Sequence, residues 1–211
     1  MSKTSTAFLT LIGAALTIAI VGGMGILWRY SLTPGAAGNP PALWPAQSRL
    51  ARKSGSLTLV MVVHPHCPCT RASIGELEIL MAQTRGRLDA SVIFLKPSGF
   101  SDNWTKTSLW HNAAAIPGVS VVVDDGREAR LFGAATSGQT MVYDRSGRLL
   151  FSGGITAARG HYGDNAGASA IAALLEQPTA PHDGGKTAVY GCALFAPRSS
   201  SPRRSAETCL K

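Results

Sequence analysis

The sequence predicts an α/β domain with a mixed sheet, preceded by an N-terminal transmembrane helix. Two observations carry this prediction. Short apolar runs rich in β-branched residues alternate with helical segments through residues 55–195, a pattern typical of a sheet covered by helices on both faces. Residues 4–28 contain no charged side chain, and about 20 apolar residues are enough to span a bilayer.

The apolar N-terminal run favours an uncleaved anchor over a signal peptide. Lys3 precedes it, and Arg29 and Tyr30 follow it as interfacial residues. A signal peptide has a shorter apolar core of about 7–15 residues, although residues 36–38 offer a late cleavage site. We expect residues 1–30 to be a single-pass anchor in the inner (cytoplasmic) membrane, inserted through residues 7–27. A short N-terminal tail inside places the domain in the periplasm or outside the cell.

Composition divides the rest of the chain. Residues 31–54 are rich in Pro, Gly and Ala and predict a linker, residues 55–195 form the domain, and residues 196–211 predict a basic disordered tail. The net charge of +8 is scattered. Because basic residues are not interleaved with aromatic ones, no nucleic-acid partner is expected.

The elements of the domain follow from its apolar periodicity. A buried strand at 57–63 leads into a helix at 70–84, because continuous β-branched residues give way to helical spacing. A second strand at 91–95 precedes a helix at 101–115 with a Ser/Asp cap. The remaining elements are a strand at 119–123, a short helix at 127–132, a hairpin of strands 139–143 and 148–152, and a helix at 165–176.

The turn between the first strand and its helix carries the chemistry. Residues 64–69 read His-Pro-His-Cys-Pro-Cys. The free N–H groups and the dipole of a helix N-terminus favour an anion, and a thiolate is an anion. We therefore predict that Cys67 is a nucleophile with a lowered pKa and a partly exposed sulfur. Protonated His64 and His66 would add positive charge.

A nucleophilic cysteine needs a second thiol to resolve the mixed disulfide. Cys69 is separated from Cys67 by one residue, Pro68. A disulfide across so small a ring departs from relaxed geometry and is easily reduced. Cys69 is the first candidate for the resolving thiol and Cys192 the second. Cys209, in the tail, is assigned no role.

The order of elements, with Cys at the first strand-to-helix turn, resembles the thioredoxin-like fold over residues 55–177. Within it the chain is similar to the membrane-anchored TlpA/ResA-like proteins, in particular to the RedB-like bacterial family. The resemblance implies a three-layer sandwich with a mixed central sheet. Their site reads W-C-x-x-C-R-x-E-x-P-x-L. Cys67 takes its first Cys and Arg71 its Arg, whereas Thr70 occupies the position of the second Cys.

Two later segments carry the same resemblance. Residues 121–133 are similar to D-x-x-G-x-x-A-x-x-(Y/F)-G, and residues 137–147 are similar to T-P-T-T-F-L-I-D-x-x-G. The proline that is cis in that family falls on Gly138. A cis bond before a residue other than proline costs about 3–4 kcal/mol, so we expect a trans Ser137–Gly138 bond. The missing ring would leave space beside Cys67 for a ligand. An exposed strand at Ser137 and Gly138 would hold a partner's backbone.

The sequence leaves three functions open. The first is a thiol–disulfide oxidoreductase without a cofactor, which acts on protein thiols and disulfides outside the cytoplasm through Cys67 and Cys69. The second is a copper-binding protein or metallochaperone, since thiolate and imidazole suit copper; its ligands would be His66, Cys67, Cys69 and His161. The third is a thiol peroxidase in which Cys192 resolves a sulfenate on Cys67.

A glycine-rich segment at 153–161 follows the last predicted strand. It lacks the Gly-Lys-Ser/Thr signature of a phosphate-binding loop. It is either a plain connection or a loop that carries Arg159 and His161 towards the cysteines.

Overall fold

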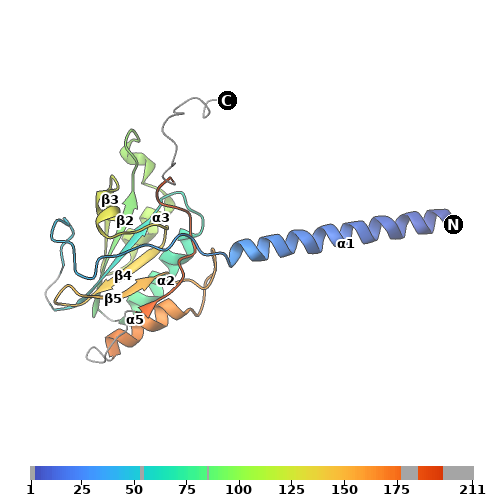
Figure 1. Ribbon diagram of the computed structural model, residues 1–211. Helices are drawn as coiled ribbons and strands as arrows, with labels where there is room; N and C mark the ends of the chain where they lie inside the picture. The colour runs from blue at the N-terminus through green and yellow to red at the C-terminus, as the bar shows by residue number, and fades with distance from the viewer. Residues whose placement is uncertain (1–2, 53–54, 85, 177–184, 197–211) are drawn as a thin grey trace.

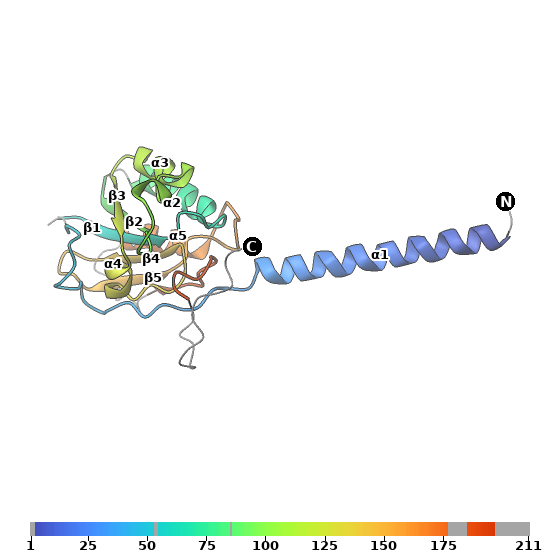
Figure 2. The same ribbon diagram turned by 90° about the horizontal axis from the view of Figure 1, so that it is seen from above.

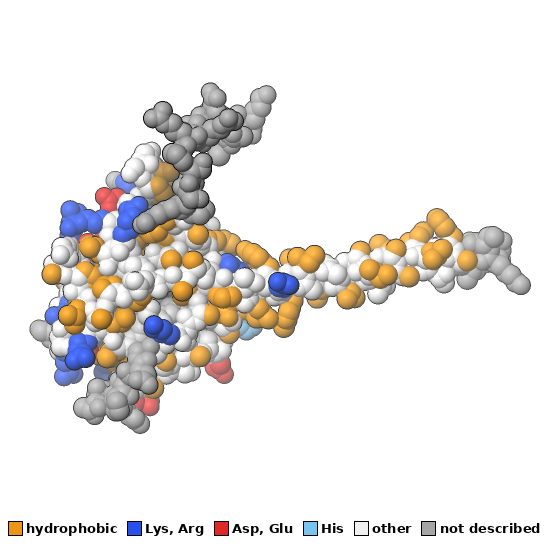
Figure 3. All heavy atoms as spheres, viewed as in Figure 1, with side chains coloured by type: hydrophobic (Ala, Val, Ile, Leu, Met, Phe, Trp, Pro, Cys, Tyr) orange, Lys and Arg blue, Asp and Glu red, His pale blue; other side chains and the backbone are white. Residues whose placement is uncertain are grey.

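The computed structural model describes residues 3–52, 55–84, 86–176 and 185–196 (Figure 1). Helix α1, Lys3–Ser31, projects away from the domain in both ribbon views (Figures 1 and 2). Within the described residues it is the one helix that can cross a membrane by length and composition. Its stretch Ala7–Ser31 is 25 residues long, has a mean hydropathy of 2.1 and is not buried. Apolar side chains lie along its length (Figure 3).

A mixed sheet forms the centre of the domain. Its strands lie in the order β3-β2-β1-β4-β5-β6 in the described part of the chain. β1 is parallel to β2, and β2 to β3, whereas β4 is antiparallel to β1 and β5 to β4. The strands are β1 Leu57–Val63, β2 Leu88–Leu95, β3 Val119–Asp124, β4 Gln139–Tyr143, β5 Leu149–Gly153 and β6 Gly185–Lys186.

The sheet separates two apolar cores and makes the domain a three-layer sandwich. β1 supplies Leu59, Met61 and Val63 to one core, and Val60 and Val62 to the other, because successive side chains of a strand point to opposite faces. Figure 2 shows α2 and α3 on one side of the sheet and α4 on the other. The helices of the domain are α2 Thr70–Thr84, η1 Asp102–Trp104, α3 Ser108–Ala115, α4 Arg127–Leu131 and α5 Ala166–Glu176.

The α4 face is completed by irregular chain. The Trp44 ring packs edge-on against Phe132 and Tyr143, with ring centroids 5.0 and 5.2 Å away. Its amide donates to the Gly147 carbonyl, and the Leu149 amide donates to Ala42. The second half of the segment predicted as a linker, 31–54, therefore forms part of the domain's covering layer; residues 53–54 lie outside the described residues.

The buried carboxylate of Glu128 fixes this covering segment. It accepts hydrogen bonds from the Ser48 hydroxyl at 2.6 Å and from the Arg49 amide at 3.0 Å. Glu128 lies in α4, so the chain before β1 and the fourth helix are tied together by one side chain.

Most predicted elements are confirmed within a few residues, but the helix predicted at 101–115 is wrong as one element. It is divided into η1 and α3. The Thr107 amide donates to the Thr105 carbonyl at 2.8 Å, and its hydroxyl donates to the Pro65 carbonyl at 3.2 Å. These bonds hold Thr107 outside the helical ladder. The predicted tail from 197 onward, with Cys209, lies outside the described residues.

We predict that Trp44→Ala destabilises the protein by about 2–3 kcal/mol, because it removes an aromatic side chain that seals the second core. The measurement is chemical unfolding of the full chain in detergent, followed by tyrosine fluorescence and circular dichroism. Leu43→Ala is the matched control, since the Leu43 side chain is 62% exposed; its free energy of unfolding should change by less than about 0.5 kcal/mol. Equal effects of the two variants would contradict this role for the segment.

Candidate functional site

The two cysteines lie in the turn between β1 and α2. The Cys67 amide donates to the His64 carbonyl at 3.1 Å, and the Thr70 amide donates to the Cys67 carbonyl at 3.1 Å. These two tight turns lead directly into the first turn of α2. Cys67 is 1% exposed and Cys69 is 8% exposed. The partly exposed sulfur expected for Cys67 is therefore wrong.

Ser137 joins this turn to the neighbouring loop. Its hydroxyl accepts a hydrogen bond from the His64 amide at 2.8 Å and lies 2.8 Å from the Thr70 hydroxyl. The next amide, of Gly138, donates to the Val62 carbonyl at 2.8 Å. Ser137 and Gly138 thus lie directly beside the β1–α2 turn, as the resemblance implied.

The glycine at position 138 keeps a trans peptide bond, as expected; no cis bond occurs in the described residues. Gly138 has a φ of +90°, and a side chain there would press on the Ser73 hydroxyl. Ser73 therefore occupies the space directly beside the Gly138 Cα.

The C-terminal segment 189–195 pairs with the loop before β4. The Ser137 amide donates to the Cys192 carbonyl at 2.8 Å, and the Leu194 amide donates to Ala135 at 2.9 Å. Thr136 and Ala193 form an antiparallel bridge. The prediction of an exposed strand for a partner is therefore wrong, because the chain's own segment already occupies that edge.

Hydrogen bonds stabilise the Cys67 thiolate. Burial raises the pKa of Cys67, but hydrogen bonds from the Cys192 thiol, the Thr70 hydroxyl and the backbone of both residues outweigh it. The net effect is a pKa below the ordinary value for a thiol, as predicted. The direction agrees with the sequence prediction, although donors that the sequence did not single out contribute to it.

The other two thiols stay protonated at neutral pH. Burial raises the pKa of Cys69, the negative charge of Cys67 raises it further, and Arg159 partly opposes both. Burial and a hydrogen bond to Cys67 raise the pKa of Cys192 to about 12. The cluster therefore holds one favoured thiolate and two protonated partners.

Arg159 connects the thiols to the end of α1. Its guanidinium hydrogen-bonds the Cys69 sulfur and donates to the Gly191 carbonyl at 2.6 Å and the Thr33 carbonyl at 3.1 Å. It also lies 4.8 Å from the centre of the Tyr30 ring, and the Arg159 amide donates to the Ser31 carbonyl at 3.0 Å. The glycine-rich segment thus brings Arg159 to the cysteines.

His161, from the same segment, is exposed. Its amide donates to the Ala158 carbonyl at 3.3 Å. The loop is held instead by the buried Glu76 of α2, which accepts hydrogen bonds from the Gly163 amide at 2.7 Å and from the Asn165 side chain at 3.3 Å. Neither Glu76 nor this anchoring role was found from the sequence.

His64 and His66 gather around Trp104, which the sequence analysis also missed. Their ring centroids lie 5.3 and 4.7 Å from that of Trp104, and His66 Nε2 lies 3.0 Å from the Trp104 carbonyl oxygen. Burial, followed by the charge of His66, lowers the pKa of His64. The lowered pKa makes His64 less readily protonated, so it is a weaker source of positive charge beside the thiolate than an ordinary histidine.

The proposed copper ligands do not converge in this structure. His66 is directed to Trp104, and His161 is exposed. Across the described ranges, no group of three or more His, Cys, Asp or Glu side chains is arranged to hold a metal ion. The four side chains are therefore not gathered around one point, and copper binding stays a prediction.

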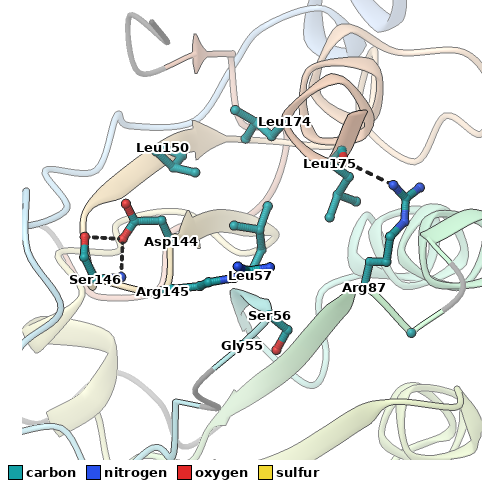
Figure 4. Close-up of a pocket in the computed structure, with 11 residues that line it drawn as sticks. Gly55, Ser56, Leu57, Arg87, Asp144, Arg145, Ser146, Leu150, Leu174 and Leu175 are labelled. Atoms are coloured by element: carbon teal, nitrogen blue, oxygen red, sulfur yellow. Dashed lines mark hydrogen bonds between the residues drawn. The ribbon is translucent and has the colours of Figure 1, made fainter. Parts of the chain in front are cut away.

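Two hollows differ in their relation to the thiols. One of about 220 Å³ is lined by Cys67 together with Pro65, His66, Pro68, Arg71 and Thr107–Leu109. A larger one of about 620 Å³ (Figure 4) lies by Leu57, Leu150 and Leu174, with Arg87 and Arg145 at its border. The larger hollow is lined by no cysteine, so the chemistry points to the smaller one.

Comparison with known proteins shows the fold. No protein-family model and no curated protein matches the sequence. An uncharacterized conserved protein from Geobacillus kaustophilus is 19% identical, with 80% of this chain and 95% of that chain covered and a TM-score of 0.55. The exposed lipoprotein thioredoxin Etrx1 from Streptococcus pneumoniae is 14% identical (66% and 99% covered, TM-score 0.45). ScoI from Bradyrhizobium japonicum, solved with copper bound, is 17% identical (67% and 99% covered, TM-score 0.39).

At sequence identities this low, the similarity shows a shared fold and not a shared function. The similarity to the Geobacillus kaustophilus protein, with a TM-score of 0.55, shows a shared fold. The mixed sheet, its strand order and the cysteine-bearing turn after β1 are those that the resemblance implied. The chain therefore has the thioredoxin-like fold, preceded by an apolar N-terminal helix.

Proposed function

We propose that the protein is a thiol–disulfide oxidoreductase whose nucleophile is Cys67. The observation that carries this proposal is the set of hydrogen bonds from Cys192 and Thr70 to the Cys67 sulfur, which lower the pKa of Cys67. The thiolate is the form that attacks a disulfide. A thiol with a lowered pKa, hydrogen-bonded to a second thiol, is what exchange with a partner disulfide requires.

Access and charge support the same function. The hollow beside Cys67 is bordered by Pro65, Pro68 and Thr107, and the exposed Arg71 lies at the same place. A disulfide that enters there meets the thiolate at the start of α2, where the helix dipole favours negative charge. No cofactor is required for this step, because the electrons come from the cysteines.

The partners we propose are protein thiols and disulfides outside the cytoplasm. α1 would anchor the chain in the inner membrane, and the domain would face the periplasm or the cell exterior. The length and mean hydropathy of Ala7–Ser31 support the anchor, and structural disulfides form and persist in that compartment. Thiol peroxidase activity through a Cys67 sulfenate stays a prediction, to be tested by peroxide consumption.

We predict that the protein accelerates the reduction of insulin disulfides by dithiothreitol, and that Cys67→Ser reduces the rate to that of dithiothreitol alone, because the attacking thiolate is lost. The assay uses the full chain in detergent and follows insulin turbidity. Cys209→Ser is the matched control, since it makes the same chemical change outside the described residues, and it should keep the wild-type rate. Full activity in Cys67→Ser would refute the proposed nucleophile.

We predict that Thr70→Val raises the pKa of Cys67 by about one unit, because a hydrogen bond to a charged group is removed. With that donor gone, less thiolate is present at pH 7. The measurement is thiolate absorbance at 240 nm against pH, with Cys67→Ser subtracted.

Thr58→Val provides the control for this titration. Thr58, in β1, is buried like Thr70, but its hydroxyl has no hydrogen-bond partner among the described residues. Its substitution should leave the titration unchanged. An unshifted midpoint in Thr70→Val would show that Thr70 does not stabilise the thiolate.

A further inference from the structure

The segment 189–195 is held in place over the cysteine turn by contacts along its whole length. Its backbone pairs with residues 135–137 in strand fashion. Before this pairing, the Gly35 amide donates to the Val189 carbonyl at 2.8 Å, and Arg159 donates to Gly191 at 2.6 Å. After it, the Leu194 side chain is buried in the second core. The position of Cys192 is therefore fixed from both sides.

Gly191 makes this close approach feasible. A side chain at position 191 would collide with the carbonyl oxygen of Ser137. With glycine there, the Cys192 thiol and backbone reach the Cys67 sulfur and hydrogen-bond it. The two thiols are thus within hydrogen-bonding reach, although they lie 125 positions apart in the sequence.

Cys69 is a poorer partner for the same sulfur. Only Pro68 lies between the two residues. The Cys69 thiol also hydrogen-bonds Cys67, so what disfavours Cys69 is the geometry of the bond and not its distance. A disulfide between them would require a strained ring. The Cys69 thiol is in addition engaged by the guanidinium of Arg159.

We propose that Cys192, rather than Cys69, resolves the mixed disulfide at Cys67, and that its segment is paired with residues 135–137 to hold it ready. This inference rests on the proposed function. It replaces the order of resolving thiols expected from the sequence, in which Cys69 came first.

The exchange balances without an outside reagent. The Cys67 thiolate attacks a partner disulfide, forms a mixed disulfide and releases one partner thiolate. Cys192 passes its proton to that thiolate and attacks the Cys67 sulfur. A Cys67–Cys192 disulfide forms and the second partner thiolate leaves, taking a proton from water. The partner gains two electrons, and the two cysteines lose them.

The charges of Cys67 and Arg159 control when Cys192 can ionise and attack. In the reduced protein, the hydrogen bond to Cys67 and the charge of Cys67 help to keep Cys192 protonated. When Cys67 enters a mixed disulfide it loses its negative charge, and both of these influences vanish. Arg159 then favours the Cys192 thiolate, because its positive charge lowers the pKa of Cys192.

Peptide mapping tests the proposal on the full chain in detergent. The reduced protein is treated with glutathione disulfide, quenched with acid, alkylated with N-ethylmaleimide and digested with trypsin. Cys67 and Cys69 share the tryptic peptide 54–71, whereas Cys192 lies in 187–198 and Cys209 in 205–211. We expect a disulfide that joins 54–71 to 187–198, with Cys69 alkylated.

Variants separate this inference from the proposed function. In Cys192→Ser the glutathione adduct on Cys67 should live about tenfold longer or more, because the remaining neighbour, Cys69, can close only a strained ring. Cys69→Ser should form the 67–192 disulfide at the wild-type rate. Gly191→Ala should also lengthen the adduct's life by displacing the segment, whereas Ala193→Ser, at an exposed position, should not.

The possible results distinguish a failure of the Cys192 proposal from a failure of the proposed function. A disulfide within 54–71, or one that joins 54–71 to 205–211, would overturn the role of Cys192 and leave Cys67 as the nucleophile. A wild-type adduct lifetime in Cys192→Ser would overturn it equally. No adduct on Cys67 in any variant would refute the proposed function itself.

Discussion

The site depends on Ser137, which joins three segments through two polar groups. Its hydroxyl binds the end of β1 at His64 and the start of α2 at Thr70, and its amide binds the carbonyl of Cys192. A buried polar group that lost such partners would cost about 1–3 kcal/mol each. Strand, helix and C-terminal segment are therefore positioned together, and the arrangement of thiols is a property of the whole sheet end rather than of the cysteine turn alone.

This arrangement concentrates negative charge on one sulfur. Burial alone would disfavour every thiolate in the cluster. The pKa of Cys67 is nevertheless lowered, because hydrogen bonds from Cys192 and Thr70 converge on its sulfur. The negative charge of Cys67 in turn raises the pKa of Cys69 and of Cys192. The two departures from the C-x-x-C pattern meet at Cys67. Thr70 supplies a hydroxyl where a second thiol would stand, and the distant Cys192 supplies a thiol that hydrogen-bonds the same sulfur.

The fold followed from local pattern, but the site did so only in part. The apolar run at 57–63 and the helical spacing at 70–84 identified β1 and α2 to the residue, because burial and backbone geometry act over short distances. The contact between Cys67 and Cys192 depends on non-local pairing of irregular chain, which leaves no periodicity in the sequence. The same holds for Trp44, whose Pro-rich surroundings indicated a linker, and for His64, whose ring orientation depends on Trp104.

The contacts of Arg159 have a consequence for the geometry of electron transfer. One guanidinium spans from the carbonyl of Thr33, two residues past the end of α1, to that of Gly191 beside Cys192. With α1 embedded in a bilayer, the reactive sulfurs would work roughly one arginine length from the level of the lipid headgroups. A soluble partner would have to approach them sideways along the membrane, whereas a thiol on an integral membrane protein would already be at the right height. The anchor would then fix the height of the thiols above the bilayer and so favour partners whose reactive groups lie at the same height.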